Sequence, residues 1–203
     1  MVATERIAAL ILAGGQSRRM GGGEKFLLPF AGSTLIDHVV ERLAPQAGAI
    51  AISANCDPAL LGHLPFPVLP DGGFAGRGPL AGLHAGLSWA KEQEATHLAS
   101  AAADTPFFPG DMVARLSAGD PQEIAVATTR GRPHPVFALW PVTLQPVLER
   151  YLAGASRFSI MGFIEDHPHR LVAFGDDHGN DPFFNVNTPE DFILAEAIAT
   201  RSN

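Results

Sequence analysis

A short apolar run that ends directly in a glycine-rich loop constrains the fold of this chain more than any other stretch. Residues 7–12 form a continuous aliphatic segment, which is typical of a strand covered on both faces. Gly14 and Gly15 follow at once and remove the Cβ atoms where the chain turns, so backbone N–H groups can approach a polyanion closely. The sequence therefore predicts a buried strand whose carboxyl end carries an anion-binding loop.

The same loop carries cations that suit the phosphates of a nucleotide. Arg18 and Arg19 can each donate two parallel hydrogen bonds to phosphate oxygens, and Lys25 adds a point charge on a flexible side chain. The loop is neither of two common phosphate loops: Phe26 follows Lys25 where a Walker loop needs Ser or Thr, and no G-x-G-x-x-G opens a helix after the strand. We favour a triphosphate-binding loop over a glycine turn with solvated arginines.

Residues 12–25 resemble the signature L-A-G-G-x-S-R-R-M-G-G-x-[DE]-K of nucleotidyltransferases that activate cofactors and sugar phosphates, and specifically that of the molybdenum-cofactor guanylyltransferases. The resemblance continues in order at Ser53–Asn55, Asp71, Gly78–Gly82, Asp104–Pro106, His134–Pro135 and Asn185–Glu190, so it covers nearly the whole chain. It implies that GMP is transferred from GTP to Mo-molybdopterin, with release of pyrophosphate and with Mg²⁺ as cofactor.

Size, charge and cysteine content narrow the remaining classes of function. With 203 residues the chain fits one domain, and we expect a single nucleotidyltransferase domain over residues 1–203. A formal net charge of −7 argues against a nucleic-acid binder, which would need a basic face. Cys56 is the only cysteine, which excludes an internal disulfide and fits a reducing cytoplasm. The N-terminus lacks a signal-peptide pattern and residues 7–13 are too short to span a bilayer, so we expect a cytoplasmic protein with no membrane partner.

Apolar periodicity along the rest of the chain predicts alternating strands and helices. We expect strands at residues 7–12, 49–53, 66–69, 96–102, 123–128, 134–140 and 170–174, with a Gly-Arg-Pro turn between the fifth and the sixth. Helices should begin after the cap residue Thr34, run through residues 80–91, and begin at Pro109, Pro141 and Pro189. This alternation is typical of an α/β, single-domain three-layer sandwich with a mostly parallel sheet. The resemblance implies the Rossmann-like, glycosyltransferase-A-like fold of the nucleotidyltransferases.

Polar residues follow several of the predicted strands at their carboxyl ends. The glycine loop follows Leu12, Asn55 follows the second strand, Asp71 the third and Asp104 the fourth. Ligands of open α/β sheets bind outside the carboxyl ends of the strands. We therefore expect these four loops to converge on one crevice.

Asp104 precedes Thr105-Pro106, which leaves two interpretations. Mg²⁺ needs only one or two protein carboxylates when phosphates and water complete its shell, so one aspartate is enough. An aspartate at this position can equally shape a turn. The residues alone weigh the two evenly, and the resemblance favours the metal, because D-T-P in these enzymes supplies the metal aspartate.

The resemblance also implies roles for individual residues. Catalysis would depend on Arg19, Lys25 and Asp104. GTP would bind along Leu12, Ala13, Gly14, Gly15, Lys25, Ser53, Asn55, Asp71 and Asp104. Ser53 departs from the family, which commonly has Asn there, and a hydroxyl lacks the fixed donor–acceptor pair of an amide. Base and ribose recognition is therefore expected more firmly from Asp71 than from Asn55.

The resemblance also implies that His134, Asn185 and Asn187 lie on the acceptor, or pterin, side. Asn187 is also a candidate ligand near the metal, and a third interpretation is that both asparagines only shape a turn and cap the last helix. A cluster of histidines at 167, 169 and 178 lies near acidic residues, but Pro168 breaks the segment. We favour a solvated acidic loop over a zinc site there.

Other functions stay open at this point. A molybdopterin cytidylyltransferase typically reads L-A-A-G where this chain has L-A-G-G, and a sugar-phosphate nucleotidyltransferase usually carries G-x-G-T-R-[LM], which is absent. A catalytically silent carrier of nucleotide or pterin would not need both Lys25 and Asp104. The expected partners are GTP and Mo-molybdopterin as substrates, with transient contacts to molybdenum-insertion and apo-molybdoenzyme delivery proteins and none to nucleic acid.

Overall fold

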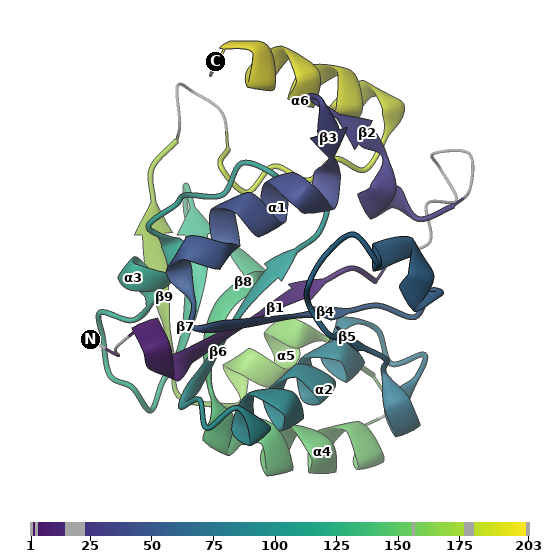
Figure 1. Ribbon diagram of the computed structural model, residues 1–203. Coiled ribbons are helices and arrows are strands. Elements are labelled where there is room, and N and C mark those ends of the chain that lie inside the picture. The colour runs from purple at the N-terminus through teal and green to yellow at the C-terminus, as the bar shows by residue number, and fades with distance from the viewer. Residues whose placement is uncertain (1, 3, 15–22, 156, 177–180, 202–203) are drawn as a thin grey trace.

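The computed structural model describes the chain apart from residues 1, 3, 15–22, 156, 177–180 and 202–203. The described residues form a seven-stranded sheet in the order β5-β4-β1-β6-β8-β7-β9 (Figure 1). Its strands are β1 (Ile7–Leu12), β4 (Ala49–Ser53), β5 (Val68–Leu69), β6 (His97–Ala102), β7 (Ile124–Thr129), β8 (Arg132–Pro141) and β9 (His169–Phe174). Within this seven-stranded sheet of the described residues, β8 alone runs antiparallel to its neighbours, so the expected mostly parallel sheet is confirmed.

Helices cover both faces of the sheet and make the molecule a three-layer sandwich. In Figure 1, α1 (Leu35–Leu43) and α3 (Met112–Leu116) lie on one face, and α2 (Pro79–Glu92), α4 (Gln145–Gly154) and α5 (Ile160–Glu165) lie on the other. Alternate residues of β1 serve the two layers: Ala9 and Ile11 pack with the α1 and α3 side, and Ala8 and Leu10 with the α2 side. Burial on both faces explains why this strand reads as a continuous apolar run.

A smaller unit extends beyond this sandwich. The hairpin of β2 (Pro29–Phe30) and β3 (Ser33–Thr34) packs with the last helix, α6 (Pro189–Arg201), and both lie above α1 in Figure 1. Phe30, Leu35, Val186 and Ala195 form its buried core. This unit joins the segment after the glycine loop to the segment that carries Asn185 and Asn187.

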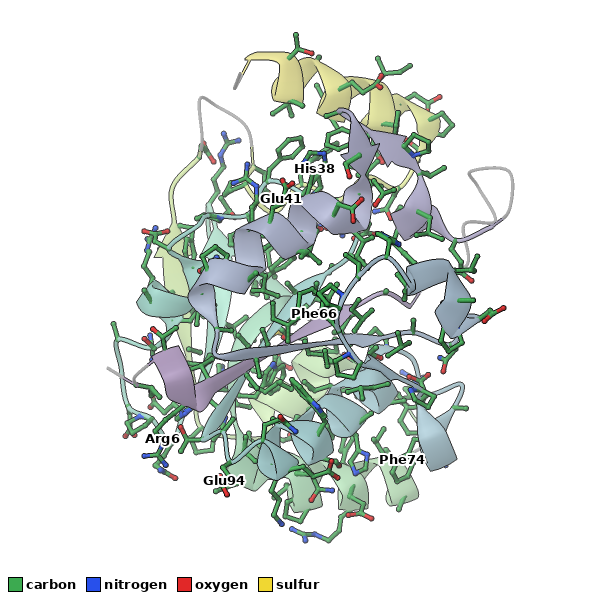
Figure 2. The ribbon with its side chains drawn as sticks, viewed as in Figure 1. Arg6, His38, Glu41, Phe66, Phe74 and Glu94 are labelled. Atoms are coloured by element: carbon green, nitrogen blue, oxygen red, sulfur yellow. The ribbon has the colours of Figure 1, made fainter. Side chains whose placement is uncertain are left out.

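Helix α1 begins where the sequence predicted it. Thr34 accepts a hydrogen bond from the Asp37 backbone N–H, and the Asp37 carboxylate accepts one from the Thr34 backbone N–H, which forms a capping box. The apolar side of the helix is buried, whereas His38 and Glu41 lie on its polar side (Figure 2), with His38 Nδ1 3.6 Å from Glu41 Oε2. Helix α6 is capped in the same way by Thr188 and Asp191.

Several predicted boundaries were wrong, each for a local reason. The turn between β7 and β8 is Arg130-Gly131, with φ of 51° and 78°, which is the positive-φ pair of a tight two-residue hairpin, so Arg132 and Pro133 already belong to β8. Pro141 ends β8 opposite His97 instead of starting a helix. The proline in the first turn of α4 is Pro146.

Other elements were shorter than predicted or had no sequence signal. Helix α3 begins at Met112 and not at Pro109, and β5 keeps only Val68 and Leu69 of the predicted residues 66–69. The sequence did not predict the β2–β3 hairpin or α5. These are segments of two to six residues, too short to show a period that distinguishes helix from strand.

Helix α2 packs so closely on the sheet that two positions on its inner side are glycine. A Cβ on Gly82 would lie 2.3 Å from Ser53 Oγ, and one on Gly86 would lie 2.5 Å from Leu10 Cδ2. Leu10 is fully buried, so its side chain has nowhere to retreat. The glycines therefore fix the distance between α2 and the strands β1 and β4.

We expect Gly86→Ala to lower the free energy of unfolding by roughly 1–2 kcal/mol, because overpacking costs more than the helix propensity that alanine recovers. Urea unfolding measures this. Gly154→Ala is the control: Gly154 is the last residue of α4, and a Cβ there meets nothing within 4 Å. Equal stability of the two variants would contradict the packing argument.

Candidate active site

A cavity of about 780 Å³ lies at the carboxyl ends of β1, β4, β5 and β6. Its walls include most of the residues singled out in the sequence: Leu12, Ala13, Gly14, Lys25, Ser53, Asn55, Asp71, Asp104, Asn185 and Asn187. The four loops thus converge on one crevice, as expected because the carboxyl ends of parallel strands lie at the same edge of the sheet. The volume falls in the range of small-molecule and cofactor sites.

Lys25, Asp104 and Asn187 meet in this cavity although they lie far apart in the sequence. Lys25 Nζ is 2.5 Å from Asp104 Oδ2 and 2.6 Å from Asn187 Oδ1. The Lys25 side chain is only 11% exposed and that of Asp104 26%. Lys25 begins the short 3-10 helix Lys25–Leu27, which fixes where its stem leaves the backbone. The result is a partly buried cluster of one cation, one anion and one amide.

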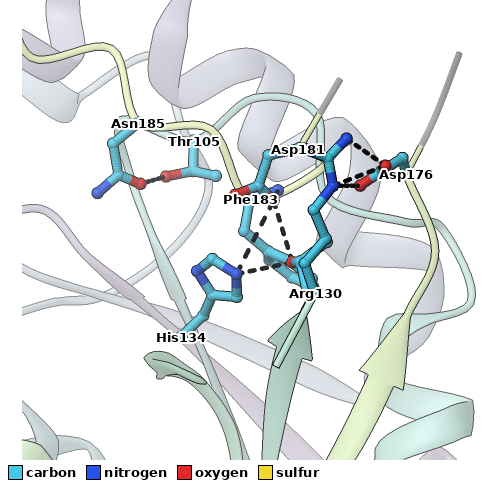
Figure 3. A network of polar contacts seen from close by, with 8 residues as sticks. Thr105, Arg130, His134, Asp176, Asp181, Phe183 and Asn185 are labelled. Carbon is cyan, nitrogen blue, oxygen red and sulfur yellow. Dashed lines mark hydrogen bonds and ion pairs between the residues drawn. The ribbon is translucent and has the colours of Figure 1, made fainter. Parts of the chain in front are cut away.

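Two contacts tie the segment carrying the asparagines to the Asp104 loop. The Val186 backbone N–H donates to the Asp104 carbonyl oxygen at 2.9 Å. The Thr105 hydroxyl donates to Asn185 Oδ1, as Figure 3 shows. Asn185 and Asn187 therefore face the cavity from a segment that is held on the carboxyl end of β6.

Asn55 and Asp71 form a reciprocal pair on another wall. Asn55 Nδ2 donates to Asp71 Oδ2 at 2.6 Å, and the Asp71 backbone N–H donates to Asn55 Oδ1 at 3.1 Å. Ser53 lies beside them but is buried against Gly82 and Leu12. Of these three residues, Asn55 and Asp71 present polar groups at the exposed edge of the cavity, while the Ser53 hydroxyl sits in the packing between α2 and the sheet.

His134 does not belong to the set of residues that line the cavity. Its Nε2 lies 2.7 Å from Thr129 Oγ1 and 3.8 Å from Asp181 Oδ1, and its ring stacks on Phe183 with centroids 4.7 Å apart (Figure 3). Burial lowers the pKa of the His134 imidazole, and the Asp181 carboxylate partly opposes that shift. Its contacts thus support the segment leading to Asn185, and Val136, in the irregular part of β8, reaches the cavity instead.

Of the residues predicted for the phosphate loop, Gly15, Arg18 and Arg19 lie outside the described residues.

His167 and His169 of the predicted histidine cluster make contacts with the backbone. His167 Nδ1 lies 2.7 Å from the Phe163 carbonyl oxygen, and His169 Nδ1 lies 2.9 Å from the carbonyl oxygen of His167. Within the described part of the chain no three His, Cys, Asp or Glu side chains gather closely enough to hold a metal ion.

The cavity also has a wall that the sequence analysis did not assign to the site. Gly76, Gly78, Pro79 and Gly82 line it, where the glycine-rich loop after β5 enters α2. Gly76 and Gly78 have φ of 84° and 64°, a backbone that side-chain-bearing residues rarely adopt. The density of glycines from 72 to 82 was the available signal, because glycine marks places where a ligand can approach the backbone.

The oxygen atoms around the Lys25 ammonium suit a hard divalent cation. The ammonium stands in for such an ion, because it is already held by one carboxylate oxygen and one amide oxygen. Mg²⁺ prefers oxygen ligands and needs few from the protein when phosphates and water supply the rest. Asp104 and Asn187 therefore fit a metal that arrives with a phosphorylated ligand.

A mostly parallel α/β sheet with a cavity at its carboxyl ends, lined by glycines, a lysine and a carboxylate, is typical of a nucleotide-binding protein. The family of MobA-like NTP transferase domains matches residues 9–170. A protein from Acidiphilium cryptum named molybdenum cofactor guanylyltransferase is 45% identical over 191 residues, which is 94% of each chain. This chain belongs to the MobA-like NTP transferase family.

Solved structures share the same fold. The molybdopterin-guanine dinucleotide biosynthesis protein A of Archaeoglobus fulgidus superposes with a TM-score of 0.76 at 24% identity, over 96% of this chain and 99% of its own. A Mycobacterium tuberculosis protein solved in complex with manganese superposes with a TM-score of 0.63 at 19% identity, over 95% of this chain and 98% of its own. None of the helices formed by the described residues combines the length and apolar character needed to cross a membrane.

Proposed function

We propose that this chain transfers GMP from GTP to Mo-molybdopterin, forming molybdopterin guanine dinucleotide and pyrophosphate, and that residues 1–203 act as a single nucleotidyltransferase domain. The observation that carries the proposal is the meeting of Lys25, Asp104 and Asn187 in one cavity. A lysine and a cation-binding oxygen pair in a glycine-lined cavity are what a triphosphate requires. The family supplies the identity of the acceptor, because full-length relatives are named molybdenum cofactor guanylyltransferase.

The reaction needs no side-chain nucleophile. The terminal phosphate of Mo-molybdopterin is already anionic, and it would attack the α-phosphorus of GTP in line while the bond to the bridging oxygen breaks and pyrophosphate leaves. Positioning and charge stabilisation supply most of the acceleration in such transfers. Lys25 is placed to neutralise phosphate oxygens, and Arg19 is assigned the same role from the signature alone.

Asp104 and Asn187 would hold Mg²⁺. When bound, the ion supplies Lewis-acid stabilisation of the charge that develops on the phosphate oxygens. The distances from one ammonium to both oxygens support this assignment, since they put the two ligands within reach of a single cation. Asn187 is accordingly assigned to the metal rather than to the pterin.

The base and ribose of GTP would lie along Leu12, Ala13 and Gly14 and reach the pair formed by Asn55 and Asp71. These two side chains hold each other by two hydrogen bonds, so a nucleoside meets a pre-oriented carboxylate and amide. Gly15 completes the loop in the signature. Asn185 faces the acceptor, and His134 acts on that side indirectly, by way of Asp181 and Phe183.

A pyrophosphate-release assay with Mo-molybdopterin and GTP, CTP or ATP tests the proposal. We expect kcat/KM for GTP to exceed that for CTP by at least about tenfold, a discrimination that differential contacts to the base can supply. Comparable values for CTP would favour the cytidylyltransferase. Absence of pyrophosphate with every nucleotide, in protein that still binds GTP, would favour a carrier. The proposed setting is the cytoplasm, with molybdenum-insertion and apo-molybdoenzyme delivery proteins as transient partners.

A further inference from the structure

Lys25 uses the same two oxygens that a divalent cation would need. Its ammonium lies 2.5 Å from Asp104 Oδ2 and 2.6 Å from Asn187 Oδ1, and because the donor is charged both contacts are charge-assisted hydrogen bonds. The other oxygen of Asp104, Oδ1, is 3.3 Å from the Thr105 hydroxyl. Lys25 thus holds Asp104 Oδ2 and Asn187 Oδ1, while the single proton of the Thr105 hydroxyl goes to Asn185.

A metal ion and the Lys25 ammonium cannot share these oxygens. Both are cations, and if they bound the same carboxylate they would lie only a few ångströms apart. Their repulsion would be strong there, because the Lys25 side chain is largely withdrawn from water. A free divalent ion must first displace the ammonium and leave it partly buried without its anion. Displacing a charge from a partly buried partner is costly.

A triphosphate removes this obstacle. It offers several anionic oxygens to the ammonium, and the long flexible stem of a lysine lets the charge move from Asp104 to a phosphate without a change in the backbone. The metal brought by the same nucleotide can then take the vacated oxygens. The exchange keeps every charge paired throughout.

We propose that Lys25 is a placeholder cation: it excludes free divalent metal from Asp104 and Asn187 and yields its place only to a metal–nucleotide complex. This rests on the proposed function for the identity of the nucleotide, and it adds an order of binding to it. The metal enters with the triphosphate and not before it.

The decisive variant is Lys25→Met, which keeps the length of the stem and removes the charge. Mn²⁺ binding without nucleotide, measured by electron paramagnetic resonance, should tighten by at least about tenfold in this variant, since the ion no longer competes with a charge-assisted pair. Binding of Mn²⁺–GTP should weaken at the same time, because the phosphates lose a cation. Opposite signs in the two measurements are the signature of a placeholder.

Two controls make the result specific. Lys91→Met removes the same charge from the exposed end of α2 and should leave Mn²⁺ affinity unchanged, which accounts for any long-range effect of net charge. Asp104→Asn combined with Lys25→Met should abolish the gain, which would place the bound ion at this site. A gain that survives the double substitution overturns the proposal.

The remaining outcomes also decide. If Mn²⁺ affinity is unchanged or weaker in Lys25→Met, the lysine is only a phosphate ligand or a structural residue, and the proposal is wrong. The metal-only measurement involves neither GTP nor Mo-molybdopterin, so it can fail while GTP turnover succeeds. Conversely, a protein that shows the metal gain and yet does not turn over GTP would refute the proposed function alone.

Discussion

Asp104→Asn is expected to lower kcat for GMP transfer by at least about a hundredfold, because a term of several kcal/mol in transition-state stabilisation is lost at about 1.4 kcal/mol per decade. An amide oxygen is a far poorer ligand for Mg²⁺ than a carboxylate. The side chain keeps its shape, so it can still form the turn before Pro106. Steady-state pyrophosphate release at saturating Mg²⁺, together with a melting curve, measures both effects.

The structure adds a consequence for stability. Asp104 is the anion of Lys25, and the asparagine leaves the ammonium with amide oxygens only. We therefore expect a lower melting temperature but a cooperative transition, since Lys25 keeps Asn187 as a partner. Loss of the fold would instead make Asp104 a structural residue.

A matched control exists in the same chain. Asp120 also precedes a proline and shapes a turn, with its Oδ1 accepting from the Gln122 backbone N–H at 2.9 Å. It does not belong to the residues that line the cavity. Asp120→Asn should have normal activity, and if Asp104→Asn loses less than about tenfold, the two are alike and Asp104 is only a turn former.

The parts of the fold that the sequence predicted well are those where one physical constraint dominates. Strand β1 and the start of helix α1 were placed to the residue because β1 is buried on both faces and because Thr34 and Asp37 cap α1 through their own side chains. The convergence of loops on one crevice followed from parallel strands alone. These features depend either on contacts between residues close in the sequence or on the parallel sheet that alternating strands and helices form.

What could not be predicted depends on tertiary pairing. Pro141 carries the same helix-start signal as Pro146, and only the pairing of Pro141 with His97 in the sheet distinguishes them. The position of His134 was equally hidden. Its neighbours Thr129, Asp181 and Phe183 come from β7 and from a segment nearly fifty residues further on, so no spacing in the sequence relates them.

For the site, the sequence identified residue types but not their partners. It singled out Lys25 for phosphate and Asp104 for metal as separate roles. The distance of 2.5 Å between Lys25 Nζ and Asp104 Oδ2 joins them at the carboxyl end of β6. Whether Asn187 serves the metal or the pterin was open in the sequence, and its contact with the same ammonium is what favours the metal.

Asn187→Ala should therefore act on the nucleotide and metal side of the reaction. We expect kcat/KM for GTP to fall by roughly 10- to 100-fold, the effect of losing a hydrogen-bonding or coordinating partner of a charged group worth about 1.5–3 kcal/mol. The Mg²⁺ concentration for half-maximal activity should rise. The KM for Mo-molybdopterin should change little, because the Asn187 amide oxygen points to the cation shared with Asp104.

Asn185→Ala is the matched comparison, since it lies two residues away in the same cavity wall but bonds to Thr105 instead of Lys25. It should raise the KM for Mo-molybdopterin and leave the Mg²⁺ requirement near that of the wild type. The pair separates two roles that the sequence left in competition, because each variant removes one amide from the same segment. If Asn187→Ala raised the KM for Mo-molybdopterin and left the Mg²⁺ requirement unchanged, Asn187 would belong to the pterin side. Of the two proposed metal ligands, Asp104 alone would then remain.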